Sequence, residues 1–231
     1  MLSVFMPVYN EESVLERSVG KTLEALQGSD FELFIVDDTS TDGTLELAAK
    51  LAAENHRIRY VRYENGPSRR ENLADAFKRA SGEVIAFLDA DLSAGPEYLP
   101  GMVRLLGGAD IVVGSRYLRE SETKRGLFRL AVSRLYNLFL RLYFKSRIRD
   151  HQCGLKVFKR DVILRLVGEA GYDRKLVRGF SWDAEILLRA QRHGYTILEI
   201  PVKWVQSDRT STRPLRELKM IPYLLGLRLR L

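Results

Sequence analysis

The sequence predicts an α/β fold, in which a mostly parallel central sheet carries helices on both faces. Short apolar runs alternate with segments of helical periodicity through the first half of the chain. The run at residues 84–88 is apolar throughout, as expected of a strand that is covered on both sides. Acidic residues directly follow several of the runs, at the strand ends where ligands bind in sheets of this kind.

Strands and helices are expected to alternate over the first 115 residues. The expected strands are residues 3–8, 31–36, 58–63, 84–88 and 111–113. The expected helices are residues 12–27, 44–55, 72–81 and 96–106. Helical spacing of apolar side chains supports the first helix, at Val14, Leu15, Val19, Leu23 and Leu26. The third helix is expected to end at Gly82, since glycine breaks a helix.

The second half of the chain departs from this alternation. Helices are expected at residues 128–144 and 182–193, and a strand at residues 196–202. The first of these helices places Arg129, Arg134 and Arg141 among apolar residues, a composition typical of helices that lie in a membrane interface. Residues 214–231 are apolar with interspersed Lys and Arg, and are expected to form a basic amphipathic segment.

Length and composition indicate one globular domain. A chain of 231 residues is long enough for one substantial core, and 45% of its residues are hydrophobic. The sequence shows no internal repeat, low-complexity tract or clear linker. We therefore expect a single domain over residues 1–231.

The net charge of +7 is concentrated in one part of the sequence. Between residues 116 and 160, Lys and Arg far outnumber Asp and Glu. Such an excess indicates an anionic partner, which could be a phosphate-bearing substrate, an anionic lipid or nucleic acid, unless it is simply a solvated basic face. Nucleic acid is the least favoured of these, because exposed aromatic residues are not interleaved with the charges.

Cysteine content and hydropathy suggest where the protein acts. Cys153 is the one cysteine, which excludes an internal disulfide and any cysteine-based zinc cluster. We find no basic and apolar leader at the N-terminus, and no apolar stretch of the ~18 residues needed for a membrane span. The expected location is the cytoplasm.

Three polar clusters are expected to meet at one edge of the sheet. Tyr9, Asn10 and Glu11 follow the first strand, residues 37–38 are an Asp-Asp pair after the second, and residues 89–91 are Asp-Ala-Asp after the fourth. The carboxyl ends of parallel strands lie at the same edge. One carboxylate could cap a helix, but a convergent set of carboxylates indicates a binding site.

The Asp-Ala-Asp turn is suited to a nucleotide-sugar diphosphate. A sugar that leaves a nucleoside diphosphate creates negative charge, which a divalent ion held by one or two carboxylates neutralises. Asp89 and Asp91 are the candidate ligands for Mg²⁺ or Mn²⁺, and Ala90 is small enough for a diphosphate to approach closely. The Asp37-Asp38 pair could contact the base and ribose, whereas Asp42 is the better candidate to cap the next helix.

Several sequence runs resemble the family 2 glycosyltransferases, which are inverting enzymes of the GT-A fold. The runs in the first half are residues 7–12 (Pro-Val-Tyr-Asn-Glu-Glu), 37–44 (Asp-Asp-Thr-Ser-Thr-Asp-Gly-Thr) and 87–92 (Phe-Leu-Asp-Ala-Asp-Leu). The runs at residues 114–117, 129–137, 149–158, 182–187 and 194–204 further resemble dolichyl-phosphate mannose synthases and dolichyl-phosphate glucosyltransferases. The resemblance covers residues 2 to about 213.

The resemblance implies roles for individual residues. The positions that match nucleoside contacts are Pro7, Tyr9, Glu11, Val36 and Asp38. Asp89, Ala90 and Asp91 match the diphosphate and metal positions. The positions that match contacts to an acceptor phosphate are Arg116, Arg129, Ser133 and Arg209. Residues 1–115 would then bind the nucleotide sugar, a UDP- or GDP-hexose, and residues 116–213 the acceptor.

The acceptor implied by the resemblance is a polyprenyl phosphate such as dolichyl phosphate. A phosphate monoester has a second pKa of ~6, so its oxygen is already ionised and needs arginines to position it rather than a base. A lipid or glycan hydroxyl would instead need a general base, for which Asp183 and Glu185 are the candidates. A non-catalytic adaptor that binds nucleotide sugar and membrane is the remaining alternative. If the acceptor is a polyprenyl phosphate, the enzyme is expected to be cytoplasmic and peripherally attached to the membrane.

Three positions depart from the family pattern. Thr39 occupies a place that is usually glycine, and because β-branched residues rarely adopt positive φ, we expect this turn to differ. Residues 65–72 replace a Gly-Lys-Gly type of stretch that approaches the donor. Ser93 stands where mannose synthases carry glutamine, which weakens a third metal contact.

Overall fold

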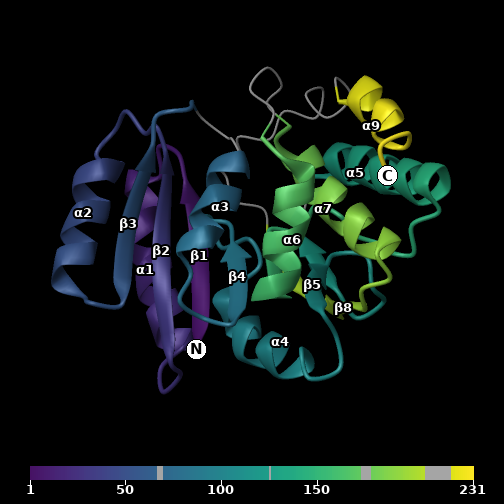
Figure 1. The fold of residues 1–231 in the computed structure, drawn as a ribbon. Helices are drawn as coiled ribbons and strands as arrows, with labels where there is room; N and C mark the ends of the chain where they lie inside the picture. The colour runs from purple at the N-terminus through teal and green to yellow at the C-terminus, as the bar shows by residue number, and fades with distance from the viewer. Residues whose placement is uncertain (67–69, 125, 173–177, 206–219) are drawn as a thin grey trace.

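The structure is a computed structural model that describes the chain except for residues 67–69, 125, 173–177 and 206–219 (Figure 1). Its strands are β1 (Leu2–Val8), β2 (Phe31–Asp38), β3 (Ile58–Tyr63), β4 (Val84–Leu88), β5 (Ile111–Ser115), β6 (Glu122–Lys124), β7 (Leu155–Lys159), β8 (Ile197–Pro201) and β9 (Lys203–Val205). Its α-helices are α1 (Glu12–Ala25), α2 (Thr44–Glu54), α3 (Arg70–Ala76), α4 (Leu99–Leu105), α5 (Leu127–Phe144), α6 (Arg160–Ala170), α7 (Phe180–Arg192) and α9 (Ile221–Leu227). Short 3₁₀ turns follow α3 and precede α4.

A seven-stranded sheet forms the centre of the fold, with strand order β3-β2-β1-β4-β7-β5-β8. Every neighbouring pair is parallel except the two pairs that involve β7. This confirms the predicted mostly parallel sheet. Strands from both halves of the sequence share it, because β7 lies between β4 and β5. In addition, β6 and β9 pair as a small parallel ribbon.

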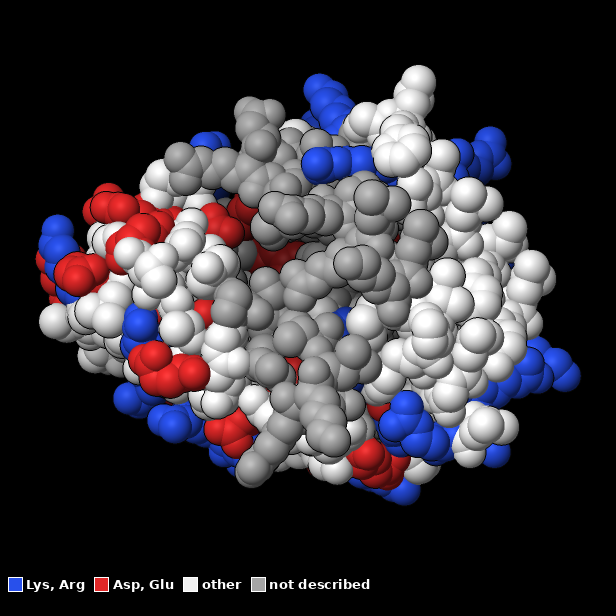
Figure 2. Space-filling view, turned by 90° about the horizontal axis from the view of Figure 1, so that it is seen from above, with Lys and Arg blue, Asp and Glu red and all other residues white. Residues whose placement is uncertain are grey.

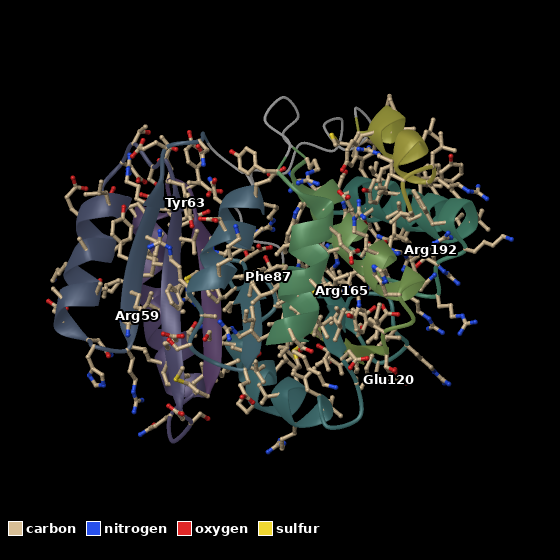
Figure 3. All side chains as sticks on the ribbon, in the orientation of Figure 1. Arg59, Tyr63, Phe87, Glu120, Arg165 and Arg192 are labelled. Carbon is tan, nitrogen blue, oxygen red and sulfur yellow. The ribbon has the colours of Figure 1, made fainter. Side chains whose placement is uncertain are left out.

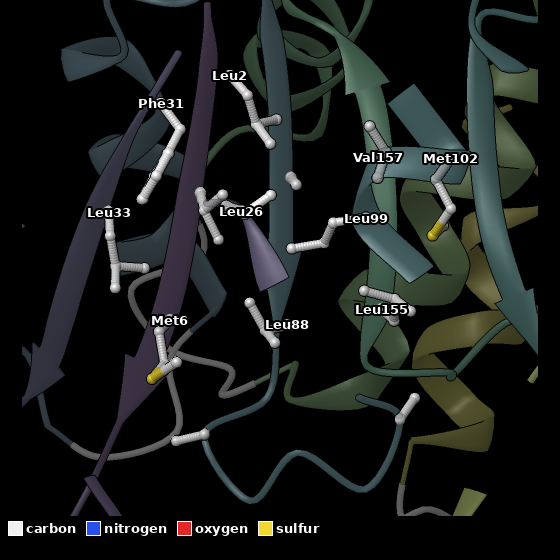
Figure 4. Close-up of a cluster of buried hydrophobic side chains, with 14 of the residues drawn as sticks. Leu2, Met6, Leu26, Phe31, Leu33, Leu88, Leu99, Met102, Leu155 and Val157 are labelled. Carbon is white, nitrogen blue, oxygen red and sulfur yellow. The ribbon is translucent and has the colours of Figure 1, made fainter. Parts of the chain in front are cut away.

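Helices cover both faces of the sheet, as predicted. On one face, α1, α2 and α4 bury a cluster that includes Leu15, Ala48 and Met102 against Val4 and Leu33 (Figure 4). On the other face, α3, α6 and α7 enclose a second cluster (Figure 1). The alternation of β1 explains this arrangement, since Leu2, Val4, Met6 and Val8 enter the first cluster while Phe5 enters the second.

Strand β7 and helix α6 were absent from the predicted elements. The strand is short, and it carries lysines at positions 156 and 159 within an otherwise apolar sequence, which hides it from a search for continuous apolar runs. Lys156 is nonetheless buried, because its ammonium group lies beside a carboxylate. Only the tertiary structure supplies that partner.

Helix α5 forms a separate layer with the C-terminal helix α9. Tyr136 and Leu140 of α5 pack against Leu224 and Leu227, and the Tyr143 hydroxyl donates to the carbonyl of Leu225. Within the described parts of the chain, no helix is both long and apolar enough to cross a membrane. The basic segment expected at residues 214–231 is described only from Met220 onward, where α9 begins one residue later.

Candidate functional site

The polar clusters that follow β1 and β2 meet at one edge of the sheet. The two strands are hydrogen-bonded neighbours, so the turns that follow them lie side by side. The backbone N–H of Asn10 donates to Ser40 Oγ at 3.0 Å, and that of Glu11 donates to Thr44 Oγ1 at 2.9 Å. The segment after β1 is thereby fixed against the turn after β2.

The Asp89-Ala90-Asp91 turn follows β4, which pairs with the opposite side of β1. The N–H of Asp89 donates to the carbonyl of Gly154 at 3.0 Å, and Ser18 Oγ of α1 donates to the carbonyl of Ala90 at 2.6 Å. The Ala90 side chain is buried in the core. These two hydrogen bonds hold the turn at Asp89 and at Ala90.

Ser93 orients the second carboxylate of the turn. Its N–H donates to Asp91 Oδ1 at 2.9 Å, and its hydroxyl donates to Asp91 Oδ2 at 2.8 Å. Ser93 therefore orients the Asp91 carboxylate directly. From the sequence, the serine in place of glutamine indicated only a weaker metal contact at this position.

Gly154 forms a cradle for the first carboxylate. It directly precedes β7, whose antiparallel pairing brings Leu155 opposite Leu88 and so places the start of β7 at the end of β4. A Cβ atom at Gly154 would overlap Oδ2 and Cγ of Asp89. Only glycine leaves the Asp89 carboxylate where it lies.

The two aspartates fit a hard divalent cation such as Mg²⁺ or Mn²⁺. Burial, and then the charge of Asp89, raise the pKa of Asp91 above its usual value. A cation between the carboxylates would relieve both effects. No cluster of three or more potential ligands is present among the described residues, and Mg²⁺ commonly uses one or two carboxylates together with substrate phosphates.

The predicted nucleoside contacts lie along β1 and β2. Pro7 is paired in register with Val36, and the Val36 side chain is buried in the core. Asp38 ends β2 and accepts a hydrogen bond from Asn72 Nδ2 at 2.9 Å. Tyr9, at 37% exposure, is open to solvent beside them. Pro7, Tyr9, Val36 and Asp38 therefore share one region, and Glu11 lies at the start of α1 next to it.

The two carboxylates of the Asp37-Asp38 pair have different surroundings. Asp37 is fully buried and accepts hydrogen bonds from Ser40 N–H, Tyr60 hydroxyl and Arg62 Nη1. Those donors engage both oxygens of Asp37 and hold the turn together. Asp42, the expected cap of α2, directly precedes the N-cap residue Gly43, and its Oδ1 accepts from Thr44 N–H.

Thr39 adopts the left-handed conformation that glycine normally supplies, with φ of 68°. Its hydroxyl donates to the carbonyl of Tyr63 at 2.8 Å and accepts from the N–H of Gly66 at 3.2 Å. These bonds offset a conformational cost of ~1–2 kcal/mol. The expectation that this turn would differ is therefore wrong. Asn10 and Leu92 also have positive φ, so unusual backbone clusters at this edge.

Four charged side chains form a network beside Asp89. Arg70 donates from Nη2 to Asp89 Oδ1 at 3.0 Å and from Nε to Asp183 Oδ2 at 3.2 Å. Lys156 donates to Asp183 Oδ1 at 3.0 Å. Both cations lie over the ring of Phe87, which Figure 3 shows between α3 and α6. We name Asp89, Arg70, Asp183 and Lys156 the charge network.

Asp183 lies in the first turn of α7 but does not cap the helix, whose N-cap residue is Gly179. Its side chain is 1% exposed, and both oxygens are engaged by cations of the charge network. Neutralising Asp183 would leave Lys156 as a buried ammonium without its carboxylate, which commonly costs about 3–5 kcal/mol. An Asp183→Asn variant therefore tests folding as much as catalysis.

Two of the predicted acceptor residues, Arg116 and Ser133, lie close together where β5 leaves the sheet. Arg116 follows β5 and is bound by Asp150, with Nε at 2.6 Å from Oδ2 and Nη2 at 2.7 Å from Oδ1. Burial alone would raise the pKa of Asp150, but the charge and hydrogen bonds of Arg116 hold it below the usual value. The Arg116 guanidinium also lies over the Tyr117 ring, whose hydroxyl donates to Ser133 Oγ at 2.7 Å.

Arg129 and Ser133 are one helical turn apart in α5 and so share a face. Arg129 is half-exposed in the first turns of the helix. Among the described residues, Asp150 accepts from Nε and Nη2 of Arg116, and none accepts a hydrogen bond from its Nη1. The fourth predicted acceptor residue, Arg209, lies outside the described residues.

A second buried ion cluster joins α3, α7 and α9. Arg178 donates from Nε to Glu71 Oε1 at 2.8 Å and from Nη1 to Glu185 Oε2 at 3.0 Å. The Tyr223 hydroxyl of α9 donates to the same Glu185 oxygen. Glu71 is adjacent to Arg70, so this cluster fixes the helix end from which Arg70 reaches Asp89.

Sequence reasoning did not find Arg70, Gly154, Lys156 or Arg178. The sequence contains one indication of Lys156, because a charged residue inside an apolar run suggests a buried ion pair. A second indication concerns Arg70, which lies in the stretch that departs from the family pattern. Gly154 was noted only as part of a longer motif. The contact that gives each residue its role joins segments remote in sequence, which no local pattern reveals.

The sequence model of one family, described as glycosyl transferase family 2, matches residues 3–166. The chain belongs to glycosyl transferase family 2. This confirms the resemblance and the expectation of an enzyme of the glycosyltransferase class.

Named relatives of this family 2 glycosyltransferase are similar over much of its length. Glycosyltransferase AglD of Haloferax volcanii is 34% identical over 223 residues, which are 94% of this chain and 35% of the relative. A dolichol-phosphate mannosyltransferase of Pyrococcus furiosus is 34% identical over 128 residues, 55% of this chain and 36% of the relative. An undecaprenyl-phosphate 4-deoxy-4-formamido-L-arabinose transferase of Pectobacterium carotovorum is 32% identical over 166 residues, 70% and 50% respectively. The chain thus spans half or less of these relatives.

Solved structures share the fold of this family 2 glycosyltransferase. Glucosyl-3-phosphoglycerate synthase of Mycobacterium tuberculosis, in complex with Mn²⁺, UDP-glucose and phosphoglyceric acid, superposes with a TM-score of 0.71 at 23% identity, over 99% of this chain and 79% of the other. A mannosyltransferase of Pyrobaculum calidifontis in complex with GDP-mannose and Mn²⁺ gives 0.60 at 21% identity, over 90% and 57%. These similarities confirm the predicted GT-A fold.

Proposed function

We propose that this family 2 glycosyltransferase transfers a hexose from a nucleotide-diphosphate sugar to a polyprenyl phosphate, with inversion and with a divalent cation. The observation that carries the proposal is the pair Asp89 and Asp91, held at the carboxyl end of β4 beside Gly154. Two of the four predicted acceptor residues, Arg116 and Ser133, lie where β5 leaves the same sheet. Two of the relatives are named as polyprenyl-phosphate sugar transferases, which supports the same class of acceptor.

The donor would lie across the ends of β1, β2 and β4. Asp38 and Tyr9 would contact the nucleoside, and Asp89 and Asp91 would hold Mg²⁺ or Mn²⁺ together with the diphosphate. When bound, the cation neutralises charge on the departing diphosphate. Solved relatives of the same fold are complexes with Mn²⁺ and either UDP-glucose or GDP-mannose, which supports this class of donor without choosing between the bases.

An ionised phosphate is favoured over a hydroxyl as the acceptor. A hydroxyl needs a base within hydrogen-bond reach of its proton, and both oxygens of Asp183 are already engaged by Arg70 and Lys156. A phosphate needs cations that position it. Arg129 and Nη1 of Arg116 would serve, with Ser133 and Tyr117 as hydroxyl partners.

A panel of UDP- and GDP-hexoses with a short polyprenyl phosphate and Mn²⁺ tests the proposal. We expect one donor class to give a lipid-linked sugar. The matching polyprenol, which ends in a hydroxyl, should react at least about 10³-fold more slowly, because its oxygen is not ionised and both oxygens of Asp183 are engaged by cations. Product is measured by mass spectrometry of the lipid extract. Equal rates with the two lipids would favour the hydroxyl acceptor, and no product with any donor would favour a non-catalytic adaptor.

The surface of α5 supports attachment to a membrane. Phe128, Leu135 and Leu142 recur every seven residues and are 72%, 65% and 73% exposed, so they form one stripe along the helix. Arg134 and Arg141 border the stripe and are also exposed. In the view from above, uncharged side chains dominate the α5 and α9 side of the molecule, with Lys and Arg at its margin (Figure 2).

We propose that this stripe lies in the interface of an anionic bilayer, at its cytoplasmic face. The same helix carries Arg129 and Ser133, so attachment would bring the acceptor residues to the lipid head groups. Buried leucines contribute ~1.5–3 kcal/mol each, and each nearby basic residue ~1 kcal/mol. Attachment of this kind is peripheral.

Replacing Leu135 and Leu142 together by serine should weaken binding to vesicles that contain phosphatidylglycerol by about tenfold or more, because both side chains lose their apolar contacts. Co-sedimentation with vesicles measures the binding. Leu198→Ser is the matched control, since Leu198 is also exposed but lies on β8. Undiminished vesicle binding by the double variant would exclude α5 as the attachment surface.

A further inference from the structure

Arg70 is placed between the cation site and the centre of the charge network. One guanidinium nitrogen binds Asp89, a proposed metal ligand, and another binds Asp183. Asp89 is 34% exposed as a side chain, whereas Asp183 is 1% exposed. Arg70 therefore bridges a carboxylate that is open to ligands and one that is sealed in the core.

The Arg70–Asp89 contact opposes the arrival of a cation. The hydrogen bond occupies Asp89 Oδ1, while Gly154 lies against Oδ2. A divalent ion that uses Asp89 meets a positive charge 3.0 Å from its ligand oxygen. Like charges at this range repel by several kcal/mol at the effective dielectric of a protein surface. Arg70 must move away from Asp89, or bind something else, for the cation to be held fully.

A diphosphate provides the alternative partner for Arg70. It carries the negative charge that draws a guanidinium, and charge-assisted bonds from arginine to phosphate oxygens are strong and often bidentate. A diphosphate held by a cation on Asp89 and Asp91 would lie next to the carboxylate that Arg70 binds in this structure. Asp183 would keep Lys156 as its partner during this movement.

Two contacts position Arg70, one at its guanidinium and one through the neighbouring residue. Its guanidinium lies over the Phe87 ring at 5.5 Å, and Glu71, the next residue, is tied to Arg178 at 2.8 Å. The segment that carries Arg70 is also where this sequence departs from the Gly-Lys-Gly type of stretch in the resembling family.

We propose that Arg70 is a donor-site residue that holds Asp89 until the donor arrives and then binds the donor diphosphate. Bound to Asp89, it lowers the affinity of the empty enzyme for a divalent cation. Bound to the diphosphate, it raises the affinity for cation and nucleotide together. Arg70 thereby makes cation binding dependent on the nucleotide. The inference rests on the proposed donor site at Asp89 and Asp91.

The test measures binding of Mn²⁺ and of nucleotide to the full chain, by calorimetry or by electron paramagnetic resonance of Mn²⁺. In Arg70→Gln, we expect Mn²⁺ to bind about tenfold more tightly without nucleotide, because Asp89 is released. With Mn²⁺ saturating, UDP or GDP, whichever the enzyme prefers, should bind about tenfold more weakly. The corresponding nucleoside, which lacks phosphates, should bind equally to variant and parent. Opposite signs for metal and diphosphate are an effect that a purely structural residue would not produce.

Two further variants keep the test decisive. Arg70→Lys retains the charge and should lie between parent and glutamine variant in both affinities. Arg79→Gln removes an exposed arginine just after α3 and should change neither. Asp183 stays paired with Lys156 in Arg70→Gln, so the variant should fold, and its melting temperature shows whether it does.

The inference is overturned if Mn²⁺ affinity without nucleotide is unchanged or lower in Arg70→Gln, or if diphosphate affinity is unchanged. The donor panel can succeed in that case, since sugar transfer needs only the site itself. Conversely, if no donor is turned over, the binding pattern still reports on Arg70. The two failures are therefore distinguishable.

Discussion

Asp91→Ala is expected to reduce sugar transfer by roughly 10³-fold or more. A bound cation contributes several kcal/mol to a reaction in which a diphosphate leaves, and Asp91 is one of the two carboxylates that would hold it. Two hydrogen bonds from Ser93 fix the Asp91 carboxylate in place. In the variant, another carboxylate cannot easily move into the same position. Initial rates at saturating Mn²⁺, with the preferred donor and polyprenyl phosphate, measure the loss.

The fold of Asp91→Ala should be intact, because the pKa of Asp91 is raised by burial and by Asp89, and removing its charge relieves that cost. Asp30→Ala is a matched control, since Asp30 is an exposed aspartate in the loop before β2 and should leave the rate unchanged. Retention of most activity by Asp91→Ala would remove the metal role from this turn.

Gly154→Ala is expected to lower the rate by about 10²-fold with little loss of stability. The added Cβ overlaps the Asp89 carboxylate, which must rotate or shift by about 1 Å, and displacements of that size in a catalytic constellation commonly cost ~10²-fold. Backbone strain does not contribute, because Gly154 is not among the glycines with positive φ. The affinity for Mn²⁺ in the presence of UDP or GDP should fall in parallel.

Gly101→Ala provides the comparison for this substitution. Gly101 lies in α4, and a Cβ there meets nothing within 4 Å. Alanine should therefore raise stability slightly, through helix propensity, and leave the rate unchanged. Thermal melting and rate measurements on both variants separate a local effect at Asp89 from a general effect of replacing glycine. Full activity in Gly154→Ala would contradict the inference that glycine is needed here to leave room for the Asp89 carboxylate.

The regular first half of the fold could be predicted because its signals are local. The apolar run at residues 84–88, the helical spacing after Glu11 and the acidic residues at strand ends are all short-range patterns. They were enough to predict a parallel sheet and to bring Asp38, Asp89 and Asp91 to one edge. Strand β7 escaped because two of its five residues are lysines, and burial of Lys156 depends on Asp183, 27 residues away.

The sequence by itself determined the fold class, the family and the acidic edge, because hydrophobic periodicity and short motifs specify secondary structure and strand ends. Only the tertiary structure decided which charged side chains are already bound to one another. Arg116 is bound by Asp150, Asp183 by two cations, and Arg70 by the carboxylate expected to bind metal. A buried charge needs an opposite charge beside it, and partners that lie 113 residues apart, such as Arg70 and Asp183, are brought together only by folding.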